Sequence, residues 1–188
     1  ITTDGGMAEY VVTRADLVHY TDKLTPAEAA LVEPLAAVVE MVKIQPPQMY
    51  SNIAVIGIGT VGLLSIRLLA KLYAPRILVA VAPPDSPKKE LAPRSGADAV
   101  ASPEEALEIA KRKTPEGLGF DYVVEASGSP EGFKLAEEIV RPRGVIAVKS
   151  THGMPVSVNL TKLVVKEVTI ATSRCGPFPE AVSLIERG

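Results

Sequence analysis

Residues 51–72, SNIAVIGIGTVGLLSIRLLAKL, decide the fold of this chain. A mostly apolar run ends in the glycine-rich residues 57–62 (GIGTVG), and the segment that follows has apolar residues at helical spacing. This order predicts a strand, a tight turn and a helix. Residues without a Cβ atom let such a turn come close to a ligand, and the helix points free N–H groups and a partial positive charge at that spot. In this context GxGxxG predicts a site for the pyrophosphate of a dinucleotide.

The composition fits a globular protein. The chain has 188 residues, 47% of them hydrophobic and 22% charged, which suits one domain, or one domain with a remnant of another. A net charge of −2 with interspersed signs leaves no electrostatic footprint for nucleic acid. No apolar run reaches membrane-spanning length and no signal peptide is visible. The single cysteine, Cys175, excludes an internal disulfide, so we expect a cytoplasmic location.

From residue 51 onward, short apolar runs alternate with amphipathic segments. After the strand of residues 52–56, we expect strands at residues 77–82, 97–101, 120–126, 144–150, 156–158 and 167–172. Helices are expected at residues 61–72, 86–95, 102–112, from 129 onward, at 161–165 and at 177–187. Continuous apolar strands between amphipathic helices predict a parallel sheet covered on both faces. The predicted fold class is therefore α/β, a doubly wound Rossmann sheet.

The residues before position 51 form two regions. Residues 8–13 and 17–20 have the pattern of short strands that cannot form a core alone. We therefore expect residues 1–24 to be a remnant of a β-rich, GroES-like catalytic domain, and residues 25–188 to be the nucleotide-binding domain with its linking helices. Because the chain begins at Ile1 in mid-pattern, we interpret it as a fragment.

The linking helices have a clear start signal. Thr25-Pro26-Ala27-Glu28 is a capping box with proline at the first helical position. Proline disfavours helical geometry in the residue before it. We therefore expect two short helices, broken near Glu33 and Pro34.

Several motifs occur in a recognisable order along the whole chain. They are residues 4–11 (DGGMAEYV), 28–35 (EAALVEPL), 57–62, 96–98 (GAD), 124–130 (VEASGSP), 140–144 (VRPRG), 163–170 (LVVKEVTI) and 173–177 (SRCGP). Together they resemble the medium-chain, zinc-type alcohol dehydrogenase superfamily. The Glu33-Pro34-Leu35 segment looks most like its polyol and threonine dehydrogenase branch. The resemblance implies hydride transfer between an alcohol and a nicotinamide cofactor, NAD or NADP, with a zinc ion polarising the substrate oxygen.

The resemblance also implies roles for particular residues. Glu33 stands where the family's side chain reaches the zinc or its bound water, although a solvated charge at a helix end is the alternative. The main zinc ligands of the family, a cysteine and a His-Glu pair, belong to positions before Ile1. We assign no catalytic residue here and expect the chain alone to bind cofactor weakly without dehydrogenase activity. The cofactor-binding residues implied are Gly57, Gly59, Thr60, Val61, Gly62, Pro83, Asp85, Lys88, Ala126, Ser127, Lys149, Thr151 and Arg174.

The choice of cofactor depends on the end of the second strand. Folds that prefer NAD usually place an acidic residue there, on the ribose 2′-OH, but this chain has Pro83. Asp85 either takes over that role or caps the next helix. Lys88 falls where the family often has a basic residue, and with Ser86 and the N–H groups of the following helix it would favour a 2′-phosphate. The sequence thus favours NADP slightly.

The implied partners are a small alcohol or carbonyl substrate and further copies of the chain. A homodimer or homotetramer is expected, with residues 154–159 as the pairing edge. Neither nucleic acid nor a membrane is expected as a partner.

Three other functions stay open. A zinc-free reductase of the same superfamily would act on an activated double bond, although Glu33 and Pro34 argue against it. A nucleotide-binding module without catalysis would use the same glycine-rich turn. A methyltransferase also has such a turn, but it would want an acidic residue soon after the second strand and would not explain the match from Val140 onward.

Overall fold

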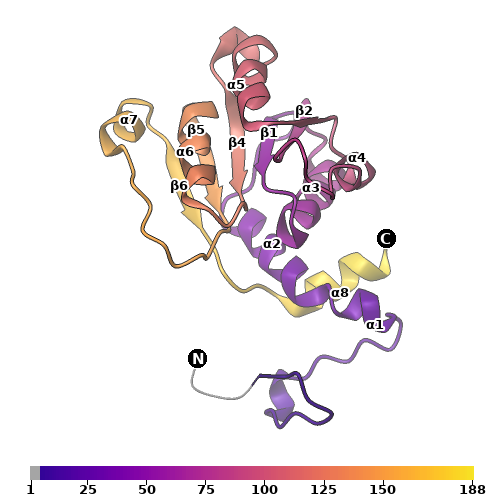
Figure 1. Cartoon of the computed structure of the whole chain (residues 1–188). Helices are drawn as coiled ribbons and strands as arrows, with labels where there is room; N and C mark the ends of the chain where they lie inside the picture. Colours follow the sequence, from indigo (N-terminus) through magenta and orange to yellow (C-terminus); the bar gives the residue numbers. More distant parts are fainter. Residues whose placement is uncertain (1–4) are drawn as a thin grey trace.

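The computed structural model describes residues 5–188, which form one parallel sheet with helices on both faces (Figure 1). The 6-stranded sheet has the order β3-β2-β1-β4-β5-β6, and every neighbouring pair is parallel. The order runs outward from β1 in both directions, so the sheet is doubly wound, as predicted. The strands are β1 (Asn52–Ile56), β2 (Ile77–Val81), β3 (Ala99–Ala101), β4 (Phe120–Glu125), β5 (Val140–Val148) and β6 (Thr169–Thr172).

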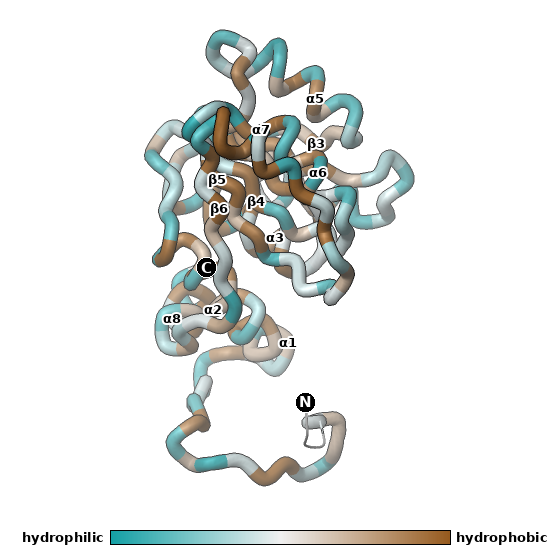
Figure 2. The backbone as a smooth tube through the Cα atoms, turned by 90° about the vertical axis from the view of Figure 1, so that its left-hand side faces the viewer, coloured by the Kyte–Doolittle hydropathy of each residue, from teal (hydrophilic) through white to brown (hydrophobic). Residues whose placement is uncertain are grey.

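Alternation along the strands divides the core into two layers, because successive side chains point to opposite faces. One face of β1 and β2 packs against α2 (Val32–Ile44), α3 (Thr60–Tyr73), α4 (Leu91–Ser95) and α8 (Phe178–Glu186), through Ile53, Val55, Leu78 and Ala80. The other face packs against α5 (Pro103–Arg112), α6 (Pro130–Ile139) and α7 (Leu160–Val165), through Ala54, Ile56, Val79 and Val81. Figure 2 shows the hydrophobic stretches gathered in the sheet. Within residues 5–188, no helix has the length and apolar character needed to cross a membrane.

Both predicted helix starts with capping boxes are confirmed. The Thr25 hydroxyl accepts a hydrogen bond from the Glu28 N–H, and the Glu28 carboxylate accepts one from the Thr25 N–H, at the start of α1 (Pro26–Ala29). Ser102 and Glu105 make the same reciprocal pair before α5. In each case two N–H groups that the helix cannot satisfy find local acceptors.

One proline-based prediction is confirmed in part, and one is wrong. The two linking helices are present as α1 and α2, but the break between them lies at Ala30 and Leu31, just before Glu33. α2 then runs through Glu33 and Pro34, because Pro34 lies in its first turn, where the missing N–H has no acceptor to lose. The helix expected from Ser86 begins only at Leu91, and residues before it form turns. An earlier start would put Pro93 in the helix interior, where its ring clashes with the preceding turn.

Three expected strands are absent among the described residues. The only regular element within residues 8–20 is a 3₁₀ turn, η1 (Ala15–Leu17), and residues 5–20 are all exposed in an arm away from the sheet (Figure 1). Residues 156–158 lie in a loop. A strand needs a neighbour to satisfy its backbone, and none of these segments has one. Residues 154–159 are therefore not an edge strand, and β6 forms that edge.

The glycine turn makes a prediction for stability. A Cβ atom at Gly62 would lie 1.9 Å from the Gly57 carbonyl oxygen. Alanine gains about 1 kcal/mol of helix propensity over glycine, but overlap with rigid backbone outweighs it. We expect Gly62→Ala to lower the free energy of unfolding by about 1–3 kcal/mol in urea denaturation.

The matched control for this prediction is Gly59→Ser. A Cβ at Gly59 meets no atom of the described residues within 4 Å, and serine is a good N-cap residue, so stability should change by only a few tenths of a kcal/mol. Equal effects of the two substitutions would contradict the steric account.

Candidate cofactor site

The turn after β1 is built by two glycines in tight contact with their surroundings. Gly57 has φ +95°, and a Cβ there would lie 2.5 Å from the Ala126 carbonyl oxygen. The Gly57 N–H donates to the Val81 carbonyl at 2.8 Å. Gly62, in the first turn of α3, lies against Gly57 itself. These contacts place the start of α3 directly over the end of β1.

The third glycine of the turn, Gly59, is not required by any close contact in the fold. Gly59 is the N-cap of α3, with a φ of −71° that any residue adopts and no side-chain cap from the described residues. Open space lies where its Cβ would be. The first N–H groups of α3, those of Thr60, Val61 and Gly62, have no acceptor within the helix. This spot therefore combines room for a ligand with a helix N-terminus that favours an anion.

A cavity of about 530 Å³ lies beside this turn, over the carboxyl ends of β1, β2 and β4. Its size is within the range of small-molecule and cofactor sites. Its walls are mostly apolar, with few polar groups. The lining residues are Ile56, Gly57, Ile58, Gly59, Val81, Ala82, Pro83, Ser86, Pro87, Lys88, Pro103, Ala126, Ser127, Ser129, Glu131, Gly132 and Leu135.

The structure divides the predicted cofactor residues into groups. Those that line the cavity are Gly57, Gly59, Pro83, Lys88, Ala126 and Ser127. Thr60, Val61 and Gly62 form the first turn of α3 beside it. Asp85 lies in the β2–α4 loop but does not line the cavity. Lys149, Thr151 and Arg174 lie farther along the sheet, after β5 and β6, and do not line it either.

Lys149 is engaged with the protein itself. Its ammonium group donates to the Ser173 hydroxyl at 2.8 Å and to the carbonyls of Ser173 and Arg174 at 3.0 and 3.4 Å. Burial lowers the pKa of Lys149, and nearby Cys175, Glu40 and Glu33 partly offset that effect. The Lys149 side chain therefore links the end of β5 to the segment after β6, and its charge serves the fold.

The start of α6 contributes lining residues that the sequence analysis missed, among them Glu131 and Leu135. Hydrogen bonds from its own backbone and from Ser129 hold the pKa of Glu131 below its usual range, and the charges of Lys134 and His152 add to this. The Ser129-Pro130 start signal marked this helix, but only the pairing of β4 with β1 brings it to the cavity. The cavity therefore carries a cation, Lys88, and an anion, Glu131.

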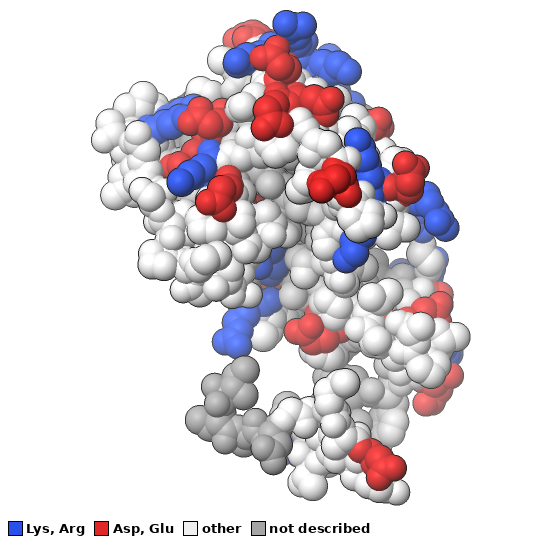
Figure 3. All heavy atoms as spheres, viewed as in Figure 1, with Lys and Arg blue, Asp and Glu red and all other residues white. Residues whose placement is uncertain are grey.

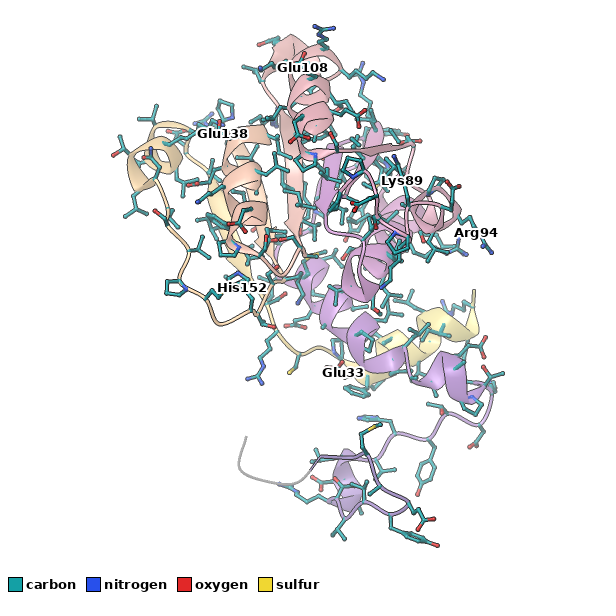
Figure 4. The ribbon with its side chains drawn as sticks, viewed as in Figure 1. Glu33, Lys89, Arg94, Glu108, Glu138 and His152 are labelled. Carbon is teal, nitrogen blue, oxygen red and sulfur yellow. The ribbon has the colours of Figure 1, made fainter. Side chains whose placement is uncertain are left out.

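The described residues do not form a zinc site. Glu33 is exposed near the start of α2, and Figure 4 shows it apart from His152, which lies in the loop after β5. Residues 5–188 contain no group of three or more His, Cys, Asp or Glu side chains that could hold a metal ion. On the face of the molecule seen in Figure 3, positively charged Lys and Arg side chains alternate with negatively charged Asp and Glu side chains. The described residues thus offer a cavity of cofactor size but no group of side chains that could hold a metal ion.

These features define a doubly wound α/β domain with a dinucleotide-type turn. Residues 60–187 match the model of a family described as zinc-binding dehydrogenase. The match covers more than half of the chain, which therefore belongs to the zinc-binding dehydrogenase family. The resemblance expected from the sequence motifs is confirmed.

Individual relatives agree with this assignment. The L-threonine 3-dehydrogenase of Caldanaerobacter subterraneus subsp. tengcongensis is 33% identical over 174 residues, which cover 90% of this chain and 49% of the relative. A Sinorhizobium meliloti 1021 protein solved bound to NADP is 25% identical with a TM-score of 0.75, covering 88% of this chain and 50% of that one. An alcohol dehydrogenase from E. coli CFT073, complexed with NADH, shares the fold at 23% identity and a TM-score of 0.85, covering 98% and 55%. The chain spans about half the length of these proteins.

The open space at Gly59 makes a second prediction. Valine there should fill the room over the turn, and we expect Gly59→Val to weaken binding of NADH and NADPH at least about tenfold, a loss of roughly 1.4 kcal/mol. The fold should lose about 1 kcal/mol or less, the usual effect at an N-cap. Calorimetric titration and urea denaturation measure the two effects, and an unchanged affinity would place the site elsewhere.

Proposed function

We propose that this chain is the cofactor-binding part of an NAD(P)-dependent oxidoreductase that interconverts an alcohol and a carbonyl compound by hydride transfer. The observation that carries the proposal is the cavity over the ends of β1, β2 and β4, next to a turn that is sterically open at Gly59. Membership of the zinc-binding dehydrogenase family supports it. The same membership argues against the methyltransferase alternative.

The residues present fit a dinucleotide. The N–H groups at the start of α3 would hold the pyrophosphate over Gly59. The apolar walls formed by Pro83, Pro103 and Leu135 would take up the adenosine half. When bound, the nicotinamide ring supplies the hydride acceptor or donor for the reaction.

The zinc-assisted step belongs to the whole protein. The described residues contain no group of three or more His, Cys, Asp or Glu side chains that could hold a metal ion. We propose that Glu33 approaches a zinc ion held mainly by residues outside this chain. A zinc-free reductase and a non-catalytic binding module remain the alternatives, and the metal content and activity of the longer protein distinguish them.

Titration of the chain with NADH and NADPH, followed by nicotinamide fluorescence, tests the proposal. We expect saturable binding of at least one cofactor and no alcohol-dependent reduction of NAD or NADP by this chain. The absence of binding would overturn the proposed function. Turnover near the rate of an ordinary enzyme, on the order of 10 s⁻¹, would show instead that the described residues suffice for the chemistry.

We propose that NADP binds at least as well as NAD. Pro83, Ser86 and Lys88 line the cavity, whereas Asp85 does not. One expected contribution is missing, because α4 begins only at Leu91 and offers no helix N-terminus beside Lys88. Glu131 opposes a further anion, but it belongs to α6, which follows β4 and so comes from the other side of β1 than the β2–α4 loop. The proposal therefore depends on Lys88 and Ser86.

Replacing Lys88 tests this preference. A charge-assisted contact contributes roughly 1.5–3 kcal/mol, so Lys88→Ala should weaken NADPH binding about tenfold or more and leave NADH binding nearly unchanged. Lys89→Ala is the matched control, because it removes the same charge from the neighbouring residue, labelled in Figure 4, which does not line the cavity. A strong preference for NADH that Asp85→Ala abolishes would contradict the prediction.

A further inference from the structure

Glu125, the last residue of β4, is a buried carboxylate that the sheet itself does not require. Only 1% of its surface is exposed, and within residues 5–188 it has no salt-bridge partner. Burying such a group is costly unless hydrogen bonds compensate for the lost water. One carboxylate oxygen accepts two of them, from the Ser127 backbone N–H at 2.9 Å and from the Ser127 hydroxyl at 2.6 Å. Both donors belong to the loop between β4 and α6.

The Ser127 hydroxyl, held by Glu125, in turn bonds to another residue of the loop. Its oxygen accepts a hydrogen bond from the Ser129 N–H at 3.1 Å, and Ser129 is the N-cap of α6. The Gly128 N–H donates to the Ser150 hydroxyl at 2.8 Å, which links the loop to the end of β5. Glu125 is thus the buried end of a short chain of hydrogen bonds through the loop.

The same loop is held between two glycines that permit no side chain. A Cβ at Gly132, in α6, would lie 2.0 Å from the Ser127 hydroxyl oxygen and 2.6 Å from the Glu125 carboxylate. On the other side, a Cβ at Gly57 would lie 2.7 Å from the Ser127 Cα atom. Ser127 is therefore wedged between α6 and the glycine turn, and it lines the cavity together with Ala126. A shift of this loop changes the cavity wall.

We propose that Glu125 is a positioning residue for the cofactor. It acts through Ser127 and holds residues 126–129 where they form one wall of the nucleotide cavity. Loss of its acceptor oxygen should therefore weaken cofactor binding beyond what the loss of stability explains. This inference rests on the proposed function.

Three substitutions test it by calorimetric titration with NADH and NADPH, well below the unfolding temperature of each variant. Glu125→Ala removes the acceptor and should raise the dissociation constant about tenfold. Glu125→Gln keeps an acceptor oxygen in place and should stay within about threefold of wild type. Glu137→Ala is the control, because Glu137 is also a buried carboxylate, bonded to the Asn159 N–H at 3.1 Å, but it does not line the cavity. It should lose stability and keep its affinity.

Glu125→Asp covers the case in which Glu125→Ala does not fold. It keeps the charge but withdraws the carboxylate from Ser127, so its dissociation constant should also rise. Wild-type affinity in either the Ala or the Asp variant would overturn the inference, as would an equal loss in Glu125→Gln and Glu125→Ala. If wild type itself binds neither cofactor, the proposed function is wrong, and the two failures are thereby distinguished.

Discussion

The contact between the first turn of α3 and the end of β1 is the constraint on which the other features depend. Gly62 allows the helix to lie on the Gly57 carbonyl, and Gly57 allows the turn to touch Ala126 at the end of β4. A side chain at either position would separate α3 from the sheet. Because these contacts are made by backbone, they cannot adjust by changing a rotamer. The helix N-terminus is therefore fixed over the central strands, beside the cavity that Gly59 lines.

The sheet order determines what surrounds that N-terminus. β2 and β4 both pair with β1, so the loops that follow them lie on either side of the turn. β5 lies one strand farther away, which is why Lys149 and Thr151 do not reach the same cavity. The Lys149 ammonium group instead bonds to Ser173 and Arg174 and joins the segments after β5 and β6.

Much of this fold could be predicted because its signals are local. Apolar runs gave the central strands, and the capping boxes gave the starts of α1 and α5. The strand errors arose where a partner far along the chain decides the outcome: residues 8–13 and 156–158 have strand-like composition but no neighbouring strand. The late start of α4 has a local cause instead, because Pro93 is tolerated only in the first turn of a helix. The start of α6 was recognised as a helix start, yet its place in the cavity wall follows only from the pairing of β4 with β1. Likewise, no local signal could reveal that the Lys149 ammonium group would donate a hydrogen bond to Ser173.

Residues that the fold does not explain are the best guide to function in this domain. Gly57 and Gly62 are glycines for steric reasons that exist without any ligand, so their presence says little about binding. Gly59 has ordinary backbone angles and open space beside it, and the fold alone would accept another residue there. Glu125 is similar, because an apolar residue would end β4 at lower cost than a buried carboxylate. Natural sequences depart from locally optimal choices mainly at functional sites. Gly59 lines the cavity, and Glu125 accepts a hydrogen bond from Ser127, which lines it too. Two such departures at one cavity are the pattern expected if a single ligand constrains both residues.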